Sequence, residues 1–261
     1  MDFTCLGAYR QLVVARSTSE RVLAVAQDGG VVTTILQRGL HEDFDGALIC
    51  KKDSQWRPLP GVGATAEDIL QGAGSSYVMC PTLSALRAVP EGMRLALVGT
   101  PCQVNALRRL QDKGDLRALQ VKLAVGLFCS HSFSYEGLIE AKLRHDLGLK
   151  PEEIRKMNIK GRFLIELFSG ETKELPLKEL RPYVRPACTR CHDFTGEKAD
   201  ISVGAVGLDG KNFVIVRTAL GKALLDRLEG SGQIETYPVD LYQKELEVLV
   251  RLALKKRTIP V

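Results

Sequence analysis

The stretch Arg94-Leu-Ala-Leu-Val-Gly-Thr-Pro-Cys-Gln103 predicts a short buried strand, followed at once by a cysteine and then by the helical pattern of residues 104–110. A second stretch, Val121-Lys-Leu-Ala-Val-Gly-Leu-Phe128, predicts another buried strand, which ends directly in Cys129. Ligands of open α/β sheets bind at the carboxyl ends of the strands. We therefore expect Cys102 and Cys129 to face one crevice.

Strands alternate with helices outward from this stretch. Further strands are predicted over residues 46–50, 162–168, 201–206 and 212–217. Helices are predicted from Thr65, over residues 135–147 and over the amphipathic tail of residues 240–256, whose Leu241, Leu246, Leu249 and Leu252 fall on one face. The alternation predicts an α/β fold with mixed sheets and flanking helices, in one compact domain with a cluster-binding loop region. No repeat or long linker marks a boundary within residues 1–261.

Composition and charge exclude several classes of protein. No apolar run approaches the roughly 20 residues of a membrane-spanning helix. The segment Met1-Asp-Phe-Thr-Cys5 lacks the basic and apolar parts of a secretory signal, so we expect a cytoplasmic protein. The net charge is +5, and the basic residues are scattered rather than clustered. This pattern favours an anionic ligand weakly and argues against nucleic-acid binding.

The chain has seven cysteines, and grouped cysteines in a reducing compartment more often bind metal or carry out redox chemistry than form disulfides. The only close pair lies in Pro186-Ala-Cys-Thr-Arg-Cys-His192. Its spacing fits covalent attachment of a c-type haem, but no export signal is visible. A thioredoxin-like redox pair is disfavoured, because a loop rather than a strand precedes the pair.

A metal or cluster site is the third interpretation of Cys188 and Cys191. Zinc would accept this pair together with His192 or His131. An iron–sulfur cluster requires four thiolates, which Cys102 and Cys129 would complete. The other cysteines show no ligand-like spacing and are interpreted as buried thiols that act as small hydrophobic side chains: Cys5, Cys50 and Cys80.

Glycine-rich segments suggest a second kind of site. In Ala26-Gln-Asp-Gly-Gly-Val-Val-Thr-Thr34 two glycines precede a helical pattern, where backbone amides and threonine hydroxyls could hold a pyrophosphate. A simple turn with a glycine N-cap is the alternative. Gly72-Ala-Gly-Ser-Ser-Tyr77 is a similar loop with an aromatic side chain that could pack on a ring. Gly61-Val-Gly-Ala-Thr-Ala66 matches the dinucleotide fingerprint, but it follows Pro58-Leu-Pro60 rather than a strand and is interpreted as a false match.

Taken together, these segments make the chain similar to the β subunit of coenzyme F420-reducing hydrogenase, a family that also contains F420 dehydrogenase subunits and chlorophyll reductases. The resemblance covers nearly the whole chain. It rests on the order and spacing of Ala15–Thr18, Ala26–Gly30, Pro101–Gln103, Gly126–Cys129, Lys160–Phe163, Pro176–Lys178, Cys188–Cys191 and Ala199–Gly204.

The resemblance implies a flavoprotein with FAD and one [4Fe-4S] cluster, which exchanges hydride with coenzyme F420 and passes single electrons to or from a partner redox subunit such as a NiFe hydrogenase. It implies an N-terminal flavin-loop part, residues 1–80, and a flavin and iron–sulfur part, residues 81–261. The implied cluster ligands are Cys102, Cys129, Cys188 and Cys191. The implied FAD-binding residues are Gln27, Asp28, Gly29, Gly30, Thr33, Ser75, Ser76 and Tyr77. Lys160 and Arg162 would offer positive charge to the flavin or to the anionic tail of the coenzyme.

Some positions depart from the family pattern. In the family a tryptophan often follows the segment that corresponds to Lys160–Phe163, whereas this chain has Leu164 there. The segment from Gly204 to Phe213 also lacks a tryptophan that is common in the family, and His131 stands where family members have an acid. The hydride partner is therefore open, and the alternatives are a same-family flavin iron–sulfur reductase of another acceptor or a zinc-stabilised binding module. The loop of Cys188 and Cys191 is expected to meet the partner subunit, because its flanks Arg185, Arg190 and Phe194 mix charged and apolar side chains.

Overall fold

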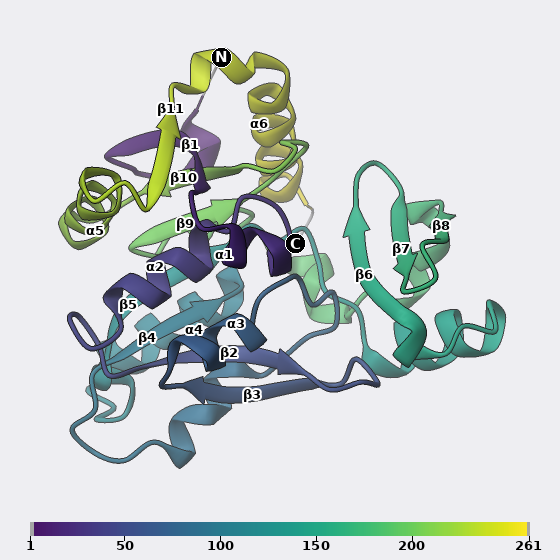
Figure 1. Cartoon of the computed structure of the whole chain (residues 1–261), viewed down its shortest axis with the longest axis horizontal. Coiled ribbons are helices and arrows are strands. Elements are labelled where there is room, and N and C mark those ends of the chain that lie inside the picture. The colour runs from purple at the N-terminus through teal and green to yellow at the C-terminus, as the bar shows by residue number, and fades with distance from the viewer. Residues whose placement is uncertain (1–2, 260–261) are drawn as a thin grey trace.

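A mixed sheet of eight strands forms the centre of the computed structural model, which describes residues 3–259 (Figure 1). Residues 1–2 and 260–261 lie outside the described residues. The segment considered for a secretory signal begins with the first two of them. In spatial order the strands are β11 (Ile234–Tyr237), β1 (Gln11–Ser17), β10 (Asn212–Val216), β9 (Ile201–Gly204), β5 (Val121–Leu127), β4 (Leu95–Gly99), β2 (Gly46–Lys52) and β3 (Pro58–Gly63).

Parallel pairing is confined to the middle of this sheet. There β4 pairs in parallel with both β2 and β5, and β5 pairs in parallel with β9. The outer pairs, which involve β1, β3, β10 and β11, are antiparallel. Gly99 at the end of β4 is in register with Gly126 of β5, so the segments that follow these two strands leave the sheet side by side.

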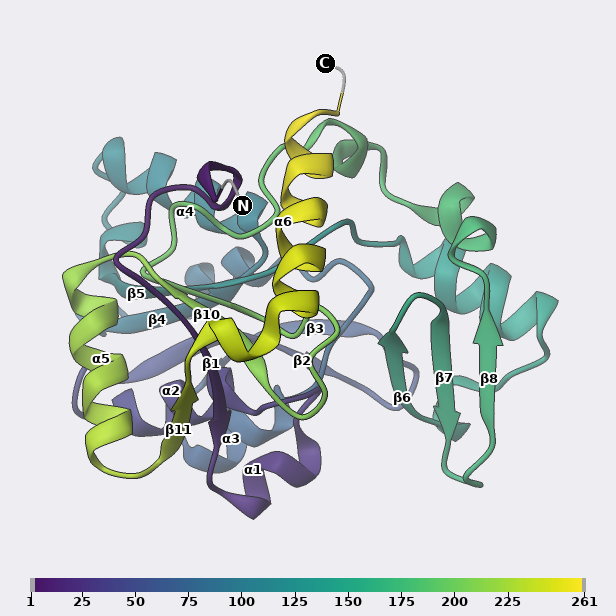
Figure 2. The same cartoon turned by 90° about the horizontal axis from the view of Figure 1, so that it is seen from above.

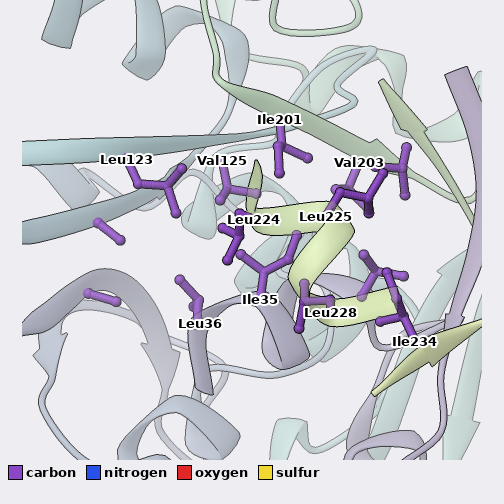
Figure 3. Packing of buried hydrophobic residues seen from close by; sticks show 14 of the residues in the cluster. Ile35, Leu36, Leu123, Val125, Ile201, Val203, Leu224, Leu225, Leu228 and Ile234 are labelled. Atoms are coloured by element: carbon purple, nitrogen blue, oxygen red, sulfur yellow. The ribbon is translucent and has the colours of Figure 1, made fainter. Parts of the chain in front are cut away.

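Helices cover both faces of the sheet, because successive strand residues point to opposite sides. Ala96 of β4 belongs to the core under α2 (Val31–Gly39), α3 (Ala66–Gln71) and α5 (Ala219–Gly230), and Figure 3 shows leucines of α5 packing toward β5 and β9. Leu95 and Leu97 belong to the core on the other face, under α4 (Pro101–Asp112). The C-terminal helix α6 (Gln243–Arg257) covers β1 and β10 through a further apolar cluster.

A small lobe stands to one side of the main sheet (Figure 2). It consists of the antiparallel strands β6 (Ile154–Ile159), β7 (Phe163–Leu167) and β8 (Thr172–Leu175) and the π-helix η4 (Glu136–Asp146), around its own apolar core. The Trp56 indole nitrogen donates a hydrogen bond to the Ile154 carbonyl at 3.3 Å, which ties the lobe to the β2–β3 hairpin.

Short helices complete the fold. They are α1 (Glu20–Val25) and the 3-10 helices η1 (Thr4–Leu6), η2 (Thr82–Ala88), η3 (Ala118–Gln120), η5 (Pro151–Glu153), η6 (Leu177–Tyr183), η7 (Pro186–Arg190) and η8 (Val239–Tyr242). Among residues 3–259, no helix combines the length and apolar character that crossing a bilayer requires.

The predicted α/β class is confirmed, and most predicted elements are present. The Thr65 hydroxyl accepts a hydrogen bond from the Asp68 amide and caps α3, as its position before two acidic residues predicts. Three details differ. Residues 58–63 form a strand rather than a loop, because an edge strand with a single neighbour tolerates proline. Leu241 is 69% exposed, because it precedes the start of α6. Strands β1, β6, β8 and β11 were not predicted.

Candidate functional site

A cavity of about 450 Å³ opens at the carboxyl edge of the parallel strands. It is lined by the segments after β4 and β5, the first turn of α2, the loop that precedes η2, and the segment around η7. We call it the central cavity. Residues from both halves of the chain meet there because neighbouring parallel strands deliver their following segments to the same edge.

All four cysteines of the predicted cluster line the central cavity. Cys102 lies in the first turn of α4, where its thiol is 3.2 Å from the Thr100 hydroxyl. Cys129 follows β5, and its amide donates to the Phe194 carbonyl at 2.9 Å. Cys188 lies within η7 and accepts a hydrogen bond from the Ser132 amide at 3.4 Å, while Cys191 ends that helix.

Burial raises the pKa of the Cys129 thiol to about 12 in the protein without bound metal. The neighbouring Cys188 and Cys102 raise this pKa further, whereas Lys256 lowers it. Thiols enter metal sites as thiolates, so a bound metal has to take the proton's place here. Cys129 therefore lies close enough to Cys188 and Cys102 to feel their charge.

Lys256 is a buried cation beside the cysteines that sequence reasoning missed. Its side chain comes from the last turn of α6 and is only 6% exposed. The ammonium donates hydrogen bonds to the carbonyls of Ser130 and Cys188, the latter at 3.2 Å. Lys256 thereby links the loop after Cys129 to the loop that carries Cys188. No local pattern in the C-terminal helix could have indicated this contact, because both partners lie far away in the sequence.

The cysteines are not gathered closely enough for a single ion. Within residues 3–259 no three His, Cys, Asp or Glu side chains stand together in a group that could hold one metal ion. His131 packs edge-on against Phe133, with 5.1 Å between the ring centroids, and Nδ1 of His192 lies 3.2 Å from the Arg257 carbonyl. Four thiols around a cubane stand farther apart than four around one ion, because each binds a different iron atom.

Gln27 connects the two glycine-rich loops. Its side-chain oxygen accepts a hydrogen bond from the Ser75 amide at 3.1 Å, and its Nε2 donates to the Met157 carbonyl of the small lobe at 3.2 Å. Gln27, Gly30, Thr33 and Ser75 all line the central cavity. Gly30 has a φ of +70° at the N-cap of α2, a conformation that favours glycine, and the first amides of a helix lack intrahelical partners.

Asp28 is an acidic group on the cavity wall, next to Gln27. Burial raises its pKa above the ordinary value of 3.8, and the cations Lys156 and Lys160 partly offset this. Lys156 also donates to the Gln27 carbonyl at 2.8 Å, so it holds this loop from the small lobe.

Gly29 has a packing role that the sequence did not reveal. A Cβ at this position would lie 2.8 Å from Cα of Lys211 and 2.7 Å from Oδ1 of Asn212. Gly29 is not among the residues that line the central cavity. The space that its missing side chain leaves is therefore filled by the start of β10 and not by a ligand.

The remaining predicted flavin residues divide into two groups. Ser76 and Tyr77 line the central cavity with Ser75, and the Tyr77 ring packs edge-on against Phe163 at 5.5 Å between centroids. Lys160 and Arg162 do not line the cavity. They form ion pairs with Asp209 at 2.9 Å and with Glu174 at 3.0 Å. The cations that line the cavity are Lys52, Arg185 and Lys256.

A second hollow, which we call the surface groove, adjoins the cysteines and has a volume of about 1360 Å³. Cys102 and Cys191 line both the surface groove and the central cavity. The groove is also lined by five cations, Arg109, Lys113, Arg190, Lys198 and Arg257, and by three acids, Asp112, Asp193 and Glu197. Phe194, expected at an interface, is only 5% exposed because it packs against Phe128, so it is not available to a partner.

Comparisons with known proteins agree with this architecture. Two family models of the coenzyme F420 hydrogenase/dehydrogenase beta subunit match, the N-terminal one over residues 12–87 and the C-terminal one over residues 92–241. The coenzyme F420 hydrogenase subunit beta of Methanococcus voltae is 33% identical, over 96% of this chain and 92% of that protein. The coenzyme F420-dependent sulfite reductase of Methanocaldococcus jannaschii is 35% identical, over 95% of this chain and 40% of that protein.

A solved structure, the F420-reducing [NiFe] hydrogenase complex from Methanosarcina barkeri, contains a chain that superposes on this one with a TM-score of 0.93. That chain is 33% identical, and the match covers 99% of this chain and 92% of that one.

Proposed function

The chain belongs to the coenzyme F420 hydrogenase/dehydrogenase beta-subunit family, and on that basis we propose that it is an oxidoreductase subunit with FAD and one [4Fe-4S] cluster. It exchanges hydride with coenzyme F420 and passes single electrons to or from a partner redox subunit in the cytoplasm. Bound FAD supplies the conversion between two-electron and one-electron transfer, and the cluster carries single electrons.

One observation carries the proposal. The predicted cluster ligands and the predicted flavin loops line the same central cavity, and Cys102 and Cys191 also reach the surface groove. A cluster held there would lie between a buried ligand site and an open face of the protein. Electrons could thus move between a hydride-exchanging flavin inside and a partner outside.

The donor set supports a cluster. Four cysteines from three separate segments meet at one cavity, and four thiolates are the ligand set of a [4Fe-4S] cluster. Lys256 donates to two carbonyls of the ligand-bearing loops and adds a positive charge next to Cys129. This charge stabilises the thiolate form, which is the form that binds iron.

The other end of the cavity supports a flavin nucleotide. The central cavity as a whole has a volume of about 450 Å³, within the range of small-molecule sites, roughly 300–1,000 Å³. Gly30 and Thr33 at the start of α2 would hold the phosphates or the ribityl chain, with Lys52 as a nearby cation. Lys160 and Arg162 would act from outside the cavity wall, since both are engaged with acids.

The surface groove supports docking of a partner. Its five cations outnumber its three acids, and Cys102 is exposed on its wall. A partner with an acidic patch around its own redox centre complements this face. The relative from Methanosarcina barkeri is part of a hydrogenase complex, which makes a hydrogenase the first candidate partner.

The test is anaerobic purification of the full chain, followed by measurement of iron, sulfide and flavin and of F420 turnover with an artificial dye. We expect iron and sulfide in a cubane ratio, bound FAD and dye-linked F420 turnover. Cys129→Ser should lose iron, whereas Cys5→Ser, a matched change at a buried thiol outside the cavity, should retain it.

Other outcomes would favour the alternatives. Zinc with no visible absorbance would favour the binding module. Flavin and iron without F420 turnover would favour a reductase of another acceptor, and full iron retention in Cys129→Ser would refute the ligand assignment.

A further inference from the structure

Lys256 is a charged side chain on the apolar face of the C-terminal helix α6. Leu249 and Ala253 on this face are fully buried, and Lys256 follows them at helical spacing. The lysine is itself only 6% exposed, whereas its neighbour Lys255 is exposed. A lysine is rarely buried to this extent without a partner, so the position calls for a physical explanation.

No acid compensates the charge of Lys256 within residues 3–259. None of the ion pairs there includes Lys256, whereas the next residue, Arg257, pairs with Glu197 at 2.8 Å. The Lys256 ammonium donates to backbone carbonyls, those of Ser130 and Cys188. A buried cation without a negative partner is costly, because carbonyl dipoles replace only part of the water that it gives up. The arrangement therefore suits a negative charge that the acids of the chain do not supply.

The predicted cluster ligands can supply this charge. Ser130 follows Cys129 directly, so both carbonyls that Lys256 contacts belong to segments that carry ligands. Lys256 also lines the central cavity together with the four cysteines. Burial raises the pKa of the Cys129 thiol to about 12, and Lys256 acts in the opposite direction. A [4Fe-4S] cluster held by four thiolates is an anion in its oxidised state, and reduction makes it more negative.

We propose that Lys256 is the counter-charge of the cluster and raises its reduction potential. The inference rests on the proposed cluster and adds a positioning residue that is not one of its four ligands. Reduction adds one electron and transfers no group, so its electrostatic effect is one further negative charge. A nearby cation stabilises the more negative reduced state most, because Coulomb attraction grows with charge and is weakly screened in the interior. Net charge around a cluster is one of the factors that set its potential.

The test is the midpoint potential of the cluster in the full chain. It is measured by anaerobic redox titration, followed by the electron paramagnetic resonance of the reduced cluster. Lys256→Gln removes the charge but retains an amide donor, Lys256→Arg retains the charge, and Lys255→Gln is the matched control at the exposed neighbour.

The neutral variant at the buried position should be the only one to shift the potential. In Lys256→Gln we expect the equilibrium to move about tenfold or more towards the oxidised cluster, which lowers the midpoint potential by about 59 mV or more. Lys256→Arg should stay close to wild type because the charge is kept. Lys255→Gln should do so because solvent screens an exposed charge.

A wild-type potential in Lys256→Gln would overturn the proposal. An equal shift in Lys256→Gln and Lys256→Arg would do so as well, because the shape of the side chain and not its charge would then matter. If Lys256→Gln binds no cluster, retention of the cluster by Lys256→Arg supports the proposal, and loss in both variants overturns it. Circular dichroism of the iron-free proteins shows whether the variants fold. A wild-type chain that binds no cluster would refute the proposed function itself, which distinguishes the two failures.

Discussion

Replacing Asp200 should destabilise the protein strongly, although this residue lies outside the central cavity. Asp200 is 6% exposed, and its carboxylate accepts three hydrogen bonds. The donors are the Arg108 guanidinium of α4 at 2.9 Å, the Ala124 amide of β5 at 2.8 Å and the Thr218 hydroxyl that precedes α5 at 2.9 Å. One side chain therefore fixes three elements, including the helix whose first turn carries Cys102.

The size of the effect follows from the groups left behind. Asp200→Ala leaves a buried amide and a partly buried guanidinium without their acceptor, and breaking such a pair costs about 3–5 kcal/mol. Asp200→Asn retains an acceptor for the Ala124 amide but not the charge, so we expect a loss of about 1–3 kcal/mol. Asp226→Ala is the matched control, because its ion pair with Lys222 is half exposed and should contribute at most about 0.5 kcal/mol.

The assay is anaerobic urea unfolding of the cofactor-loaded protein, followed by fluorescence and by cluster absorbance, with iron content measured beforehand. We expect the unfolding midpoint to fall in the order wild type, Asp200→Asn, Asp200→Ala, with Asp226→Ala close to wild type. We also expect Asp200→Ala to bind less iron, since α4 carries Cys102. An Asp200→Ala protein within about 0.5 kcal/mol of the control would refute the reasoning, because it would mean that the three hydrogen bonds contribute nothing net.

Three further predictions concern the site. Gly29→Ala should lower the free energy of unfolding by about 1–3 kcal/mol, because the new Cβ would lie 2.8 Å from the Lys211 backbone. Gly61→Ala is the control: its Cβ would have no other atom within 4 Å, so it should change the free energy of unfolding little in the same denaturation assay. Lys256→Met leaves two carbonyls without a donor and should lower iron retention during chelator challenge, while Lys255→Met at the exposed neighbour should not. Burial raises the pKa of Asp28 above 3.8, so the folded protein binds the carboxyl proton more tightly than the unfolded chain does. The stability that this proton contributes is therefore present at acid pH and is lost as the pH rises through the pKa of the folded state. In parallel thermal unfolding, the stability of Asp28→Asn relative to wild type should therefore rise as the pH is raised above the ordinary carboxyl pKa of 3.8, and a difference that stays constant with pH would contradict this.

The sequence alone determined the fold class and placed two cysteines directly after two of the central strands. The apolar runs that became β4 and β5 are each followed at once by a cysteine, and a parallel arrangement carries both cysteines to one edge. These features are local, since a buried strand and a helix start leave their signals in consecutive residues. Edge strands β3 and β11 gave weaker signals, because prolines and glycines interrupt β3 and β11 is only four residues long.

Only the tertiary structure decided which side chains share the site. Lys160 and Arg162 looked available for an anion in the sequence, but Asp209 and Glu174 pair with them in the folded chain. Lys256 reaches Ser130 across 126 positions of sequence. Such contacts depend on the order of strands in the sheet and on how helices pack over it. A one-dimensional pattern does not encode them, because packing brings distant residues together without any regular spacing along the chain.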